Sequence, residues 1–338
     1  IGRIILKKDR LLSDSLINNS LSFSAATATS NSGFQIEPQS GVFVHNVNAT
    51  VNVSRANTLQ MGKHSGFTSK VGLILSGSDI ITDFNSVIEL KGGNFTIGDA
   101  PGEGLYYNTG SFIKANNGYL DIAGSLSRYQ TASTVNFSMD TNGTTRVLRL
   151  GSTDSTKIGF DLGNVCSAFN MPGRRIIIAK GVSGAIADFY VSATQGSGMT
   201  GGMIQAGDST IAANNPIKLK GSMPVYMLHS ANALGSPTST TINEMEFTVR
   251  NNYYVDANHS VNFLGNALAL GGDLINYGNF NSANGRLTLN GNANTQTIFN
   301  QTGSALALYN FAVQKINGGL VVLGAANSNL VVRNIFEF

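Results

Sequence analysis

The chain has 338 residues and a formal net charge of +3, with 42% apolar but only 12% charged residues. This apolar content with so little net charge excludes a disordered chain. The basic residues are scattered and are not interleaved with aromatic side chains, which excludes a nucleic-acid-binding groove. The single cysteine, Cys166, excludes a disulfide framework and a cysteine-ligated zinc site. No apolar run approaches the roughly 20 residues of a transmembrane helix.

Residues 1–32 are predicted to form a cap or lead-in segment. The spacing of apolar residues in "IILKKDRLLSDSLINNSL" fits a short helix or two strands, and both interpretations stay open. The chain starts at Ile1 instead of Met and closes on a strand-like "NLVVRNIFEF". We therefore expect a processed or trimmed piece of a longer polypeptide.

Residues 33–124 carry short bursts of β-branched and aromatic residues, such as "GVFVHN", "VGLILSG" and "GYLDIAG". Each burst is bounded by Gly, Asn or Ser, and their centres recur about every 10 residues, which is typical of many short strands. Residues 125–259 are less regular. There "VNFSMDTNGTTRVLRL" predicts an antiparallel hairpin, because Asn142 and Gly143 suit the two positive-φ positions of a tight turn.

Residues 260–338 return to the regular pattern, which we expect to continue beyond the last residue. Short strands separated by Gly and Asn fit an antiparallel sandwich or a parallel solenoid, in which each coil contacts only its neighbours. We predict an all-β, parallel, right-handed β-solenoid, with residues 125–259 as irregular coils or an antiparallel insertion. Gly and Asn supply left-handed corners, and stacked Asn side chains can form hydrogen-bonded ladders.

The segment from Gly272 to Val332 resembles a repeat of very large surface proteins of Bacteroidota, the gliding-motility adhesins and other type IX secretion cargoes. The matching segments are "GDLINYGNF" (272–280), "GRLTLNG" (285–291), "TQTI" (295–298) and "LYNFAVQKINGGLVVLG" (308–324). Leu274 departs from the pattern, which usually has Trp there. The resemblance covers about a fifth of the chain and contains no catalytic residue.

The resemblance implies a non-enzymatic fragment of an extracellular cell-surface protein, an adhesin or stalk, exported across the outer membrane. Its partners would be the type IX secretion translocon and its accessory proteins during export, and glycans or surfaces afterwards. Ser15, Ser155 and Ser209 lie in Asp-Ser triplets that look like O-glycosylation sites of that phylum, although a plain turn explains such triplets better.

The alternative is a β-helical polysaccharide lyase or glycoside hydrolase. Glycoside hydrolysis needs two carboxylates at a fixed distance, and the most closely spaced candidates are Asp79, Asp83, Asp99 and Glu103. Asp99 and Glu103 would bind a structural Ca²⁺ only with further ligands from a neighbouring coil. We predict no catalytic residue, metal site or cofactor.

Two tyrosine pairs are candidates for carbohydrate binding, Tyr106 with Tyr107 and Tyr253 with Tyr254. In an extended segment one ring of each pair points inward and the other outward. The outward ring could stack on a sugar. A third hypothesis, an antiparallel multi-domain surface protein, would show hairpin ladders instead of parallel ones.

Overall fold

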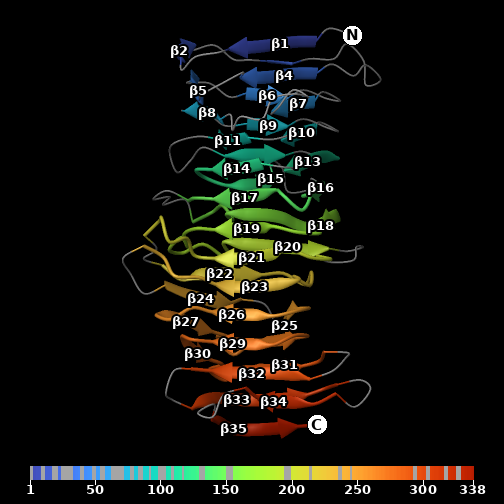
Figure 1. The fold of residues 1–338 in the computed structure, drawn as a ribbon, viewed down its shortest axis with the longest axis vertical. Helices are drawn as coiled ribbons and strands as arrows, with labels where there is room; N and C mark the ends of the chain where they lie inside the picture. The colour runs from blue at the N-terminus through green and yellow to red at the C-terminus, as the bar shows by residue number, and fades with distance from the viewer. Residues whose placement is uncertain are drawn as a thin grey trace.

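The computed structural model shows an all-β column in which the chain coils from the N-terminus at one end to the C-terminus at the other (Figure 1). Up to residue 97 it describes strand backbones. Side chains are described at residue 97 and, for most of the chain, from residue 104 to residue 338, except those of residues 111, 112, 118, 164, 165, 167 and 193. The gaps there are 108–109, 116–117, 129–133, 150–154, 194–198, 213–214, 235–237, 244–245, 292–294, 302–304, 316–318 and 325–328.

Thirteen strands, one from each successive coil, form the first sheet. They are β2 (Leu12–Leu16), β5 (Val42–Val47), β8 (Gly72–Ser76), β11 (Gly93–Ile97), β14 (Gly118–Ile122), β17 (Thr144–Val147), β19 (Arg175–Ile178), β21 (Met203–Ala206), β23 (Met227–Ser230), β26 (Tyr253–Val255), β29 (Leu274–Asn276), β32 (Gln296–Asn300) and β34 (Val321–Leu323).

A second sheet of 17 strands is built from two ladders that merge. One ladder holds β1 (Arg3–Lys8), β4 (Gly33–Pro38), β7 (Thr58–Met61), β10 (Val87–Leu90), β13 (Ser111–Ala115) and β16 (Val135–Ser138). The other holds β3 (Ser22–Phe23), β6 (Val51–Val53), β9 (Ile80–Thr82), β12 (Leu105–Tyr107) and β15 (Leu126–Arg128). Both end on β18 (Phe160–Asn170), whose first residue pairs with β15 and whose last residues pair with β16.

The second sheet continues below β18 with β20 (Phe189–Ala193), β22 (Ile217–Lys220), β24 (Thr238–Ile242), β27 (His259–Asn262) and β30 (Asn279–Asn281). A third sheet of five strands begins lower down. It holds β25 (Glu246–Val249), β28 (Ala267–Leu270), β31 (Arg286–Leu289), β33 (Leu306–Val313) and β35 (Leu330–Glu337). From β19 to β24 each coil has two strands, and from β25 to β30 each coil has three.

All pairings between the described strands are parallel, so the predicted parallel β-solenoid is confirmed. The predicted hairpin over residues 135–150 is wrong. β16 and β17 pair not with each other but with strands of the coils above and below. Local turn chemistry at Asn142 and Gly143 suits a hairpin, but burial of alternate residues in a continuous core favours stacking. The first 32 residues contain strands β1, β2 and β3, which decides between the helix and strand interpretations.

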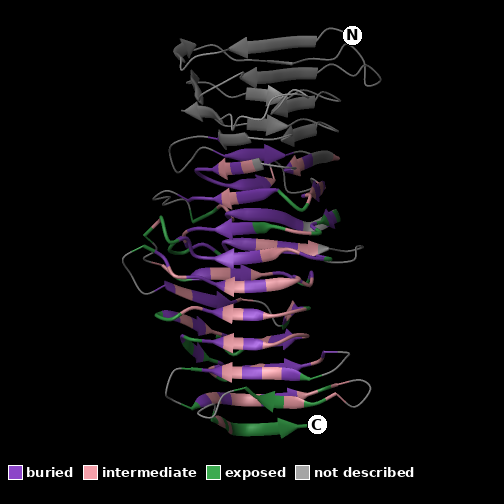
Figure 2. Ribbon diagram, in the orientation of Figure 1, coloured by how far each residue is buried: buried purple, intermediate pink, exposed green. Residues whose placement is uncertain are grey.

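The core is a continuous apolar column inside the coils (Figure 2). Inward and outward residues alternate along strands such as β16, β22 and β27, as the period of two along a strand requires. Phenylalanines stack along the axis: the Phe160 ring lies 5.6 Å from Phe189 and 5.4 Å from Phe137. Burial of these rings and of the aliphatic residues around them stabilises the column.

Many of the repeat's glycines serve close packing between coils instead of left-handed corners. A Cβ on Gly285 would lie 2.1 Å from the carbonyl oxygen of Asn266, in the coil before. Gly271 and Gly291 meet carbonyl oxygens of the preceding coil in the same way, at 2.3 and 2.2 Å. None of the three has positive φ. Our expectation of left-handed corners is therefore wrong for these glycines.

One buried pair of stacked asparagines forms the side-chain hydrogen bond expected of an asparagine ladder. Asn276 Nδ2 donates to Asn300 Oδ1 at 2.6 Å, and Asn276 Oδ1 accepts the N–H of Gly278. Both asparagines are buried. Because each amide is hydrogen-bonded, the polar cost of placing it inside is offset.

Candidate functional site

The two tyrosine pairs behave differently. Tyr253 is buried and Tyr254 is half-buried on the outer face, as predicted for an extended segment. In the other pair both rings are buried. Tyr107 donates to the carbonyl of Asp161 at 2.6 Å, and Lys157 covers Tyr106, with Nζ 4.3 Å from the ring centroid. The Tyr106 ring is not exposed as a sugar platform requires, because a lysine two coils further along the column covers it.

Two of the three candidate serines fall on described turns. Ser155 and Ser209 are exposed in turns. Asp208 accepts the backbone N–H and the hydroxyl of Thr210, which is the local bonding that favours a turn. The side chain of Ser15 lies outside the described residues, as do Asp79, Asp83, Asp99 and Glu103.

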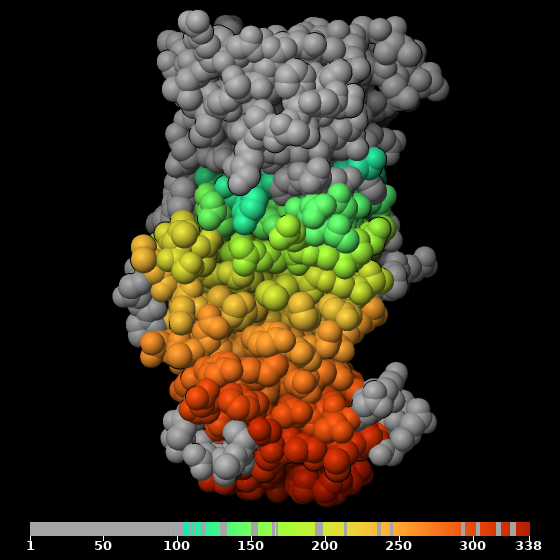
Figure 3. Space-filling view, viewed as in Figure 1, coloured from blue at the N-terminus to red at the C-terminus, as the bar shows by residue number. Residues whose placement is uncertain are grey.

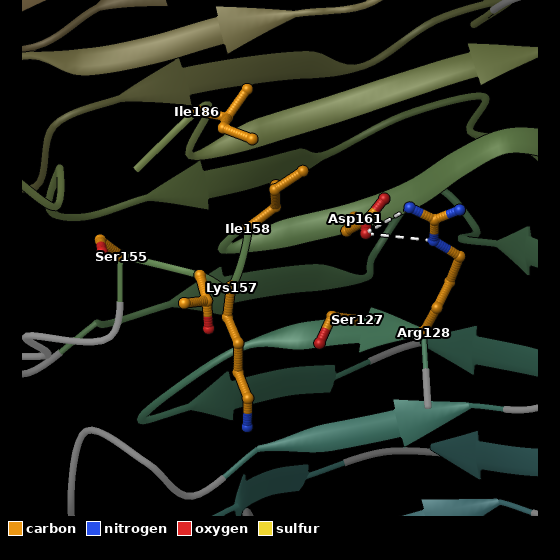
Figure 4. Close-up of a pocket in the computed structure, with 8 residues that line it drawn as sticks. Ser127, Arg128, Ser155, Lys157, Ile158, Asp161 and Ile186 are labelled. Atoms are coloured by element: carbon orange, nitrogen blue, oxygen red, sulfur yellow. Dashed lines mark hydrogen bonds and ion pairs between the residues drawn. The ribbon is translucent and has the colours of Figure 1, made fainter. Parts of the chain in front are cut away.

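A cleft of about 310 Å³ opens beside the start of β18 (Figure 4). Its walls come from three coils. Ser127 and Arg128 belong to β15, the segment 155–158 and Asp161 to the next coil, and Ile186 to the one after. The lining combines two cations, one carboxylate, three hydroxyls and two isoleucines. Sequence reasoning missed the site, because its residues come together only when coils stack.

Arg128 and Asp161 form the charged wall of the cleft. Arg128 Nε and Nη2 both lie 3.2 Å from Asp161 Oδ2, and the N–H of Gly163 donates to Asp161 Oδ1 at 2.7 Å. β18 is irregular here, with register shifts on both sides of Gly163. Gly163 has a φ of 67°, and a Cβ there would lie 3.0 Å from Arg128 Nη1. Burial raises the pKa of Asp161, and the positive charge of Arg128 opposes that shift.

A second, fully buried ion pair lies behind the segment 155–158. Arg149 Nη2 is 3.7 Å from Asp188 Oδ1, and Arg149 Nη1 donates to the carbonyl of Lys157 at 3.2 Å. Asp188 also accepts the backbone N–H groups of Val182 and Lys218, both at 3.0 Å. Burial raises the pKa of Asp188 to about 6, against the lowering effect of Arg149. These bonds fix the chain segment that carries Lys157.

The outer face of the 13-stranded sheet carries a second candidate surface, which we call the outer row: His229, Tyr254, Ile275 and Phe299. Strand register places the four side chains one above another on successive coils, and each is half-buried. Tyr277, which is 45% exposed, extends the row sideways, with its ring 5.4 Å from Phe299. Parallel strands lie about 4.8 Å apart, so the row has a fixed repeat.

A buried polar chain lies behind the outer row. The hydroxyls of Tyr253, Ser230 and Thr240 are linked at 2.9 and 3.2 Å, and Thr240 Oγ1 lies 2.8 Å from His259 Nε2. His259 Nδ1 is 2.9 Å from the carbonyl of Ala231, so that nitrogen carries the proton and Nε2 accepts from Thr240. Burial lowers the pKa of His259 to about 4. The imidazole is therefore neutral and structural.

Within the described part of the chain, no three acidic, histidine or cysteine side chains gather as metal ligands. The described residues also contain no helix with the length and hydrophobicity to cross a bilayer. Comparisons with protein-family models, curated proteins and solved structures return no match to this chain.

Proposed function

We propose that this chain is a non-enzymatic, rod-forming part of a secreted cell-surface protein, an adhesin or stalk, and that it binds glycans through the outer row. The observation that carries the proposal is the register of the row. His229, Tyr254, Ile275 and Phe299 are stacked on consecutive coils by continuous parallel pairing.

The coil stack suits a spacer. Each coil hydrogen-bonds to the one before and the one after, so length grows by about 4.8 Å per coil without a new core having to be designed. The successive bands of Figure 3 follow the coils along the column. Low charge on the whole chain leaves an exterior rich in amides and hydroxyls, which can bond to sugars.

The outer row suits a polysaccharide chain. The face of an aromatic ring carries negative potential and attracts the C–H groups on a pyranose face. Tyr254 and Phe299 lie two coils apart, about 10 Å at this strand spacing. A linear glycan running along the column would meet both rings, with Ile275 between them. Polar groups flank the rings: Asn252 Nδ2 donates to Tyr254 Oη at 3.1 Å, and His229 Nε2 lies 2.9 Å from Asp256 Oδ1.

Export by the type IX secretion system, an extracellular location and contact with its outer-membrane translocon are part of the proposal. Their support is the motif resemblance of residues 272–332. The fold by itself does not fix a function, because solenoids include enzymes and binding proteins.

A panel of purified polysaccharides tests the proposal, with retention of the protein and release of new chain ends scored together. We expect retention without release. Tyr254→Ala and Phe299→Ala should each weaken retention about tenfold, if each ring contributes about 1.4 kcal/mol. Tyr119→Ala is the matched control, because Tyr119 is a half-buried tyrosine of the same sheet, several coils away in β14. Release of chain ends would instead support the lyase or hydrolase alternative. Equal losses in all three variants would refute the outer row as the binding surface.

A further inference from the structure

The cleft beside β18 is separate from the outer row, and its residues have no part in the function proposed above. It lies at the 17-stranded sheet, whereas the outer row lies on the 13-stranded sheet. Its volume of about 310 Å³ is at the small end of the range for ligand sites, roughly 300–1,000 Å³. The two surfaces can therefore be tested independently.

The charges of the cleft do not cancel. The one carboxylate among the described lining residues, Asp161, accepts from Arg128 and from the N–H of Gly163. Lys157, the second lining cation, makes no ion pair with any described residue, and its Nζ lies 2.7 Å from the phenol oxygen of Tyr106. A neutral phenol does not compensate an ammonium group. The described lining residues thus carry one net positive charge, which favours an anionic ligand.

The other lining residues of the cleft are uncharged and are of two kinds, hydroxyl-bearing and aliphatic. Ser127, Ser155 and Thr156 supply hydroxyls that both donate and accept. Ile158 and Ile186 supply an apolar side, and Ile186 is 66% exposed although it is a large aliphatic residue. In the view of Figure 4, Ser127 lies between Lys157 and the Arg128–Asp161 pair, and the two isoleucines lie above Lys157. A compact ligand with hydroxyls on its edge and C–H groups on its face matches such walls.

We propose that the cleft binds a carboxylate-bearing sugar, a uronic acid unit, as a free acid or within an acidic polysaccharide. Lys157 meets the carboxylate, the serine hydroxyls bond to the ring hydroxyls, and Ile186 packs on the C–H face. The Arg128–Asp161 pair keeps its internal bonds and holds the far wall. Charge-assisted bonds of the ammonium–carboxylate type are about twice as strong as neutral ones, so Lys157 dominates the affinity.

Calorimetric titration with D-galacturonate, its neutral methyl ester and tri-galacturonate tests this proposal. We expect saturable binding of the acid that weakens with added salt, and binding of the ester at least about tenfold weaker, the loss of one charge-assisted bond. Tri-galacturonate binding more tightly than the single unit would identify the polymer as the source, and equal affinity would identify the free acid. Equal binding of acid and ester would overturn the proposal, and so would acetate binding as tightly as galacturonate.

Two lysine variants provide the matched comparison. Lys157→Met keeps the aliphatic stem over Tyr106 and should weaken galacturonate binding about tenfold. Lys220→Met is the control, because Lys220 lies over Tyr190 in a similar way, with Nζ 5.3 Å from the ring centroid, but outside the cleft. Tyr254→Ala should leave galacturonate binding unchanged, which separates this site from the outer row. An unchanged Lys157→Met protein, or the same loss in Lys220→Met, would refute the assignment.

Discussion

Two stretches of the column stack their coils in the same parallel way but differ in coil length and in the polar groups that they bury. In the cleft coils, which hold β15 to β20, register partners lie far apart in the sequence, as Thr145 and Ile176 do. In the repeat coils, which hold β26 to β32, they are closer, as Tyr253 and Leu274 are. The extra residues of the cleft coils form the turn at 155–156 and the segment around Ile186, which make the cleft walls.

The cleft coils and the repeat coils also bury different kinds of polar group. The cleft coils bury charges, Arg149 with Asp188, whereas the repeat coils bury neutral amides and hydroxyls, such as Asn276 and Asn300. A neutral amide is buried at little cost when it bonds to the amide of the next coil, as Asn276 does to Asn300. A buried charge needs a specific set of partners and occurs once. The comparison teaches that departure from the repeat marks the part of a solenoid where a specific site can form.

The largest expected effect is loss of the buried carboxylate of the cleft coils. Asp188→Leu leaves the N–H groups of Val182 and Lys218 without an acceptor and Arg149 without its counter-ion. We expect a loss of about 4 kcal/mol in the free energy of unfolding, measured by urea denaturation. Asp188→Asn keeps one acceptor oxygen and should cost clearly less. Equal losses of unfolding free energy in Asp188→Leu and Asp188→Asn would show that the remaining acceptor oxygen does not stabilise the fold.

The second-largest expected loss of stability comes from disturbing the close packing between repeat coils. Gly285→Ala places a Cβ against the carbonyl of Asn266, and we expect a loss of about 3 kcal/mol, at the upper end for overpacking. Gly265→Ala is the control. Nothing lies within 4 Å of its Cβ, but its φ is 84°, so only backbone strain of about 1 kcal/mol is expected. A larger loss at Gly265 in urea denaturation would contradict the role given to close approach.

Lowering the pH should change the stability of the repeat coils and of the cleft coils in opposite directions. The pKa of His259 is lowered to about 4 in the fold, so its contribution to stability is present above about 6.5 and is lost as pH falls toward 4. Between pH 7.5 and 4.5 this loss amounts to roughly 2–3 kcal/mol. The pKa of Asp188 is raised to about 6, so its contribution is present below about 3.8 and is lost as pH rises through 6.

Hydrogen exchange at the two pH values measures the two regions separately. We expect amides of the repeat coils near β27 to lose protection on acidification, and those near β20 to gain it or to lose less. His259→Gln should remove the acid loss near β27. The same loss in both regions, unchanged in that variant, would refute the assignment to His259.

The smallest effect concerns the asparagine ladder. Asn300→Ala removes the acceptor of the buried Asn276 amide and should cost about 1–2 kcal/mol. Asn334→Ala removes an equivalent but exposed bond to Asn310, at 2.8 Å, and should change stability by less than about 0.5 kcal/mol. Equal urea midpoints for the two variants would show that burial of the ladder adds nothing.

The sequence predicts much of the fold because the repeat coils obey local rules. Alternating apolar residues between Gly and Asn indicate short strands at regular spacing, and the Asn ladder follows from the same pattern. The prediction failed at residues 135–150, where Asn142 and Gly143 fit a hairpin turn. Local turn chemistry cannot tell whether the next strand pairs with its neighbour or with the coil above.

The candidate sites were less predictable. The pair Tyr253 and Tyr254 could be selected from the sequence, because one tyrosine of an extended pair points outward, but only the structure shows that Tyr254 is the outward one. Tyr106 could not be judged, because its ring is covered by Lys157 from another coil. No short motif marks the cleft, whose charged pair, Arg128 and Asp161, is 33 residues apart.

By itself, the sequence determined that this chain is all-β, made of short strands and held together by apolar side chains and amides. These properties follow from composition and from a period of two, which any short segment displays. Only the tertiary structure decided which strand pairs with which, the coil-to-coil contacts that require glycine, and the meeting of Lys157, Arg128 and Asp161 in one cleft. Those depend on the register between coils, which is set by the summed burial of the whole column.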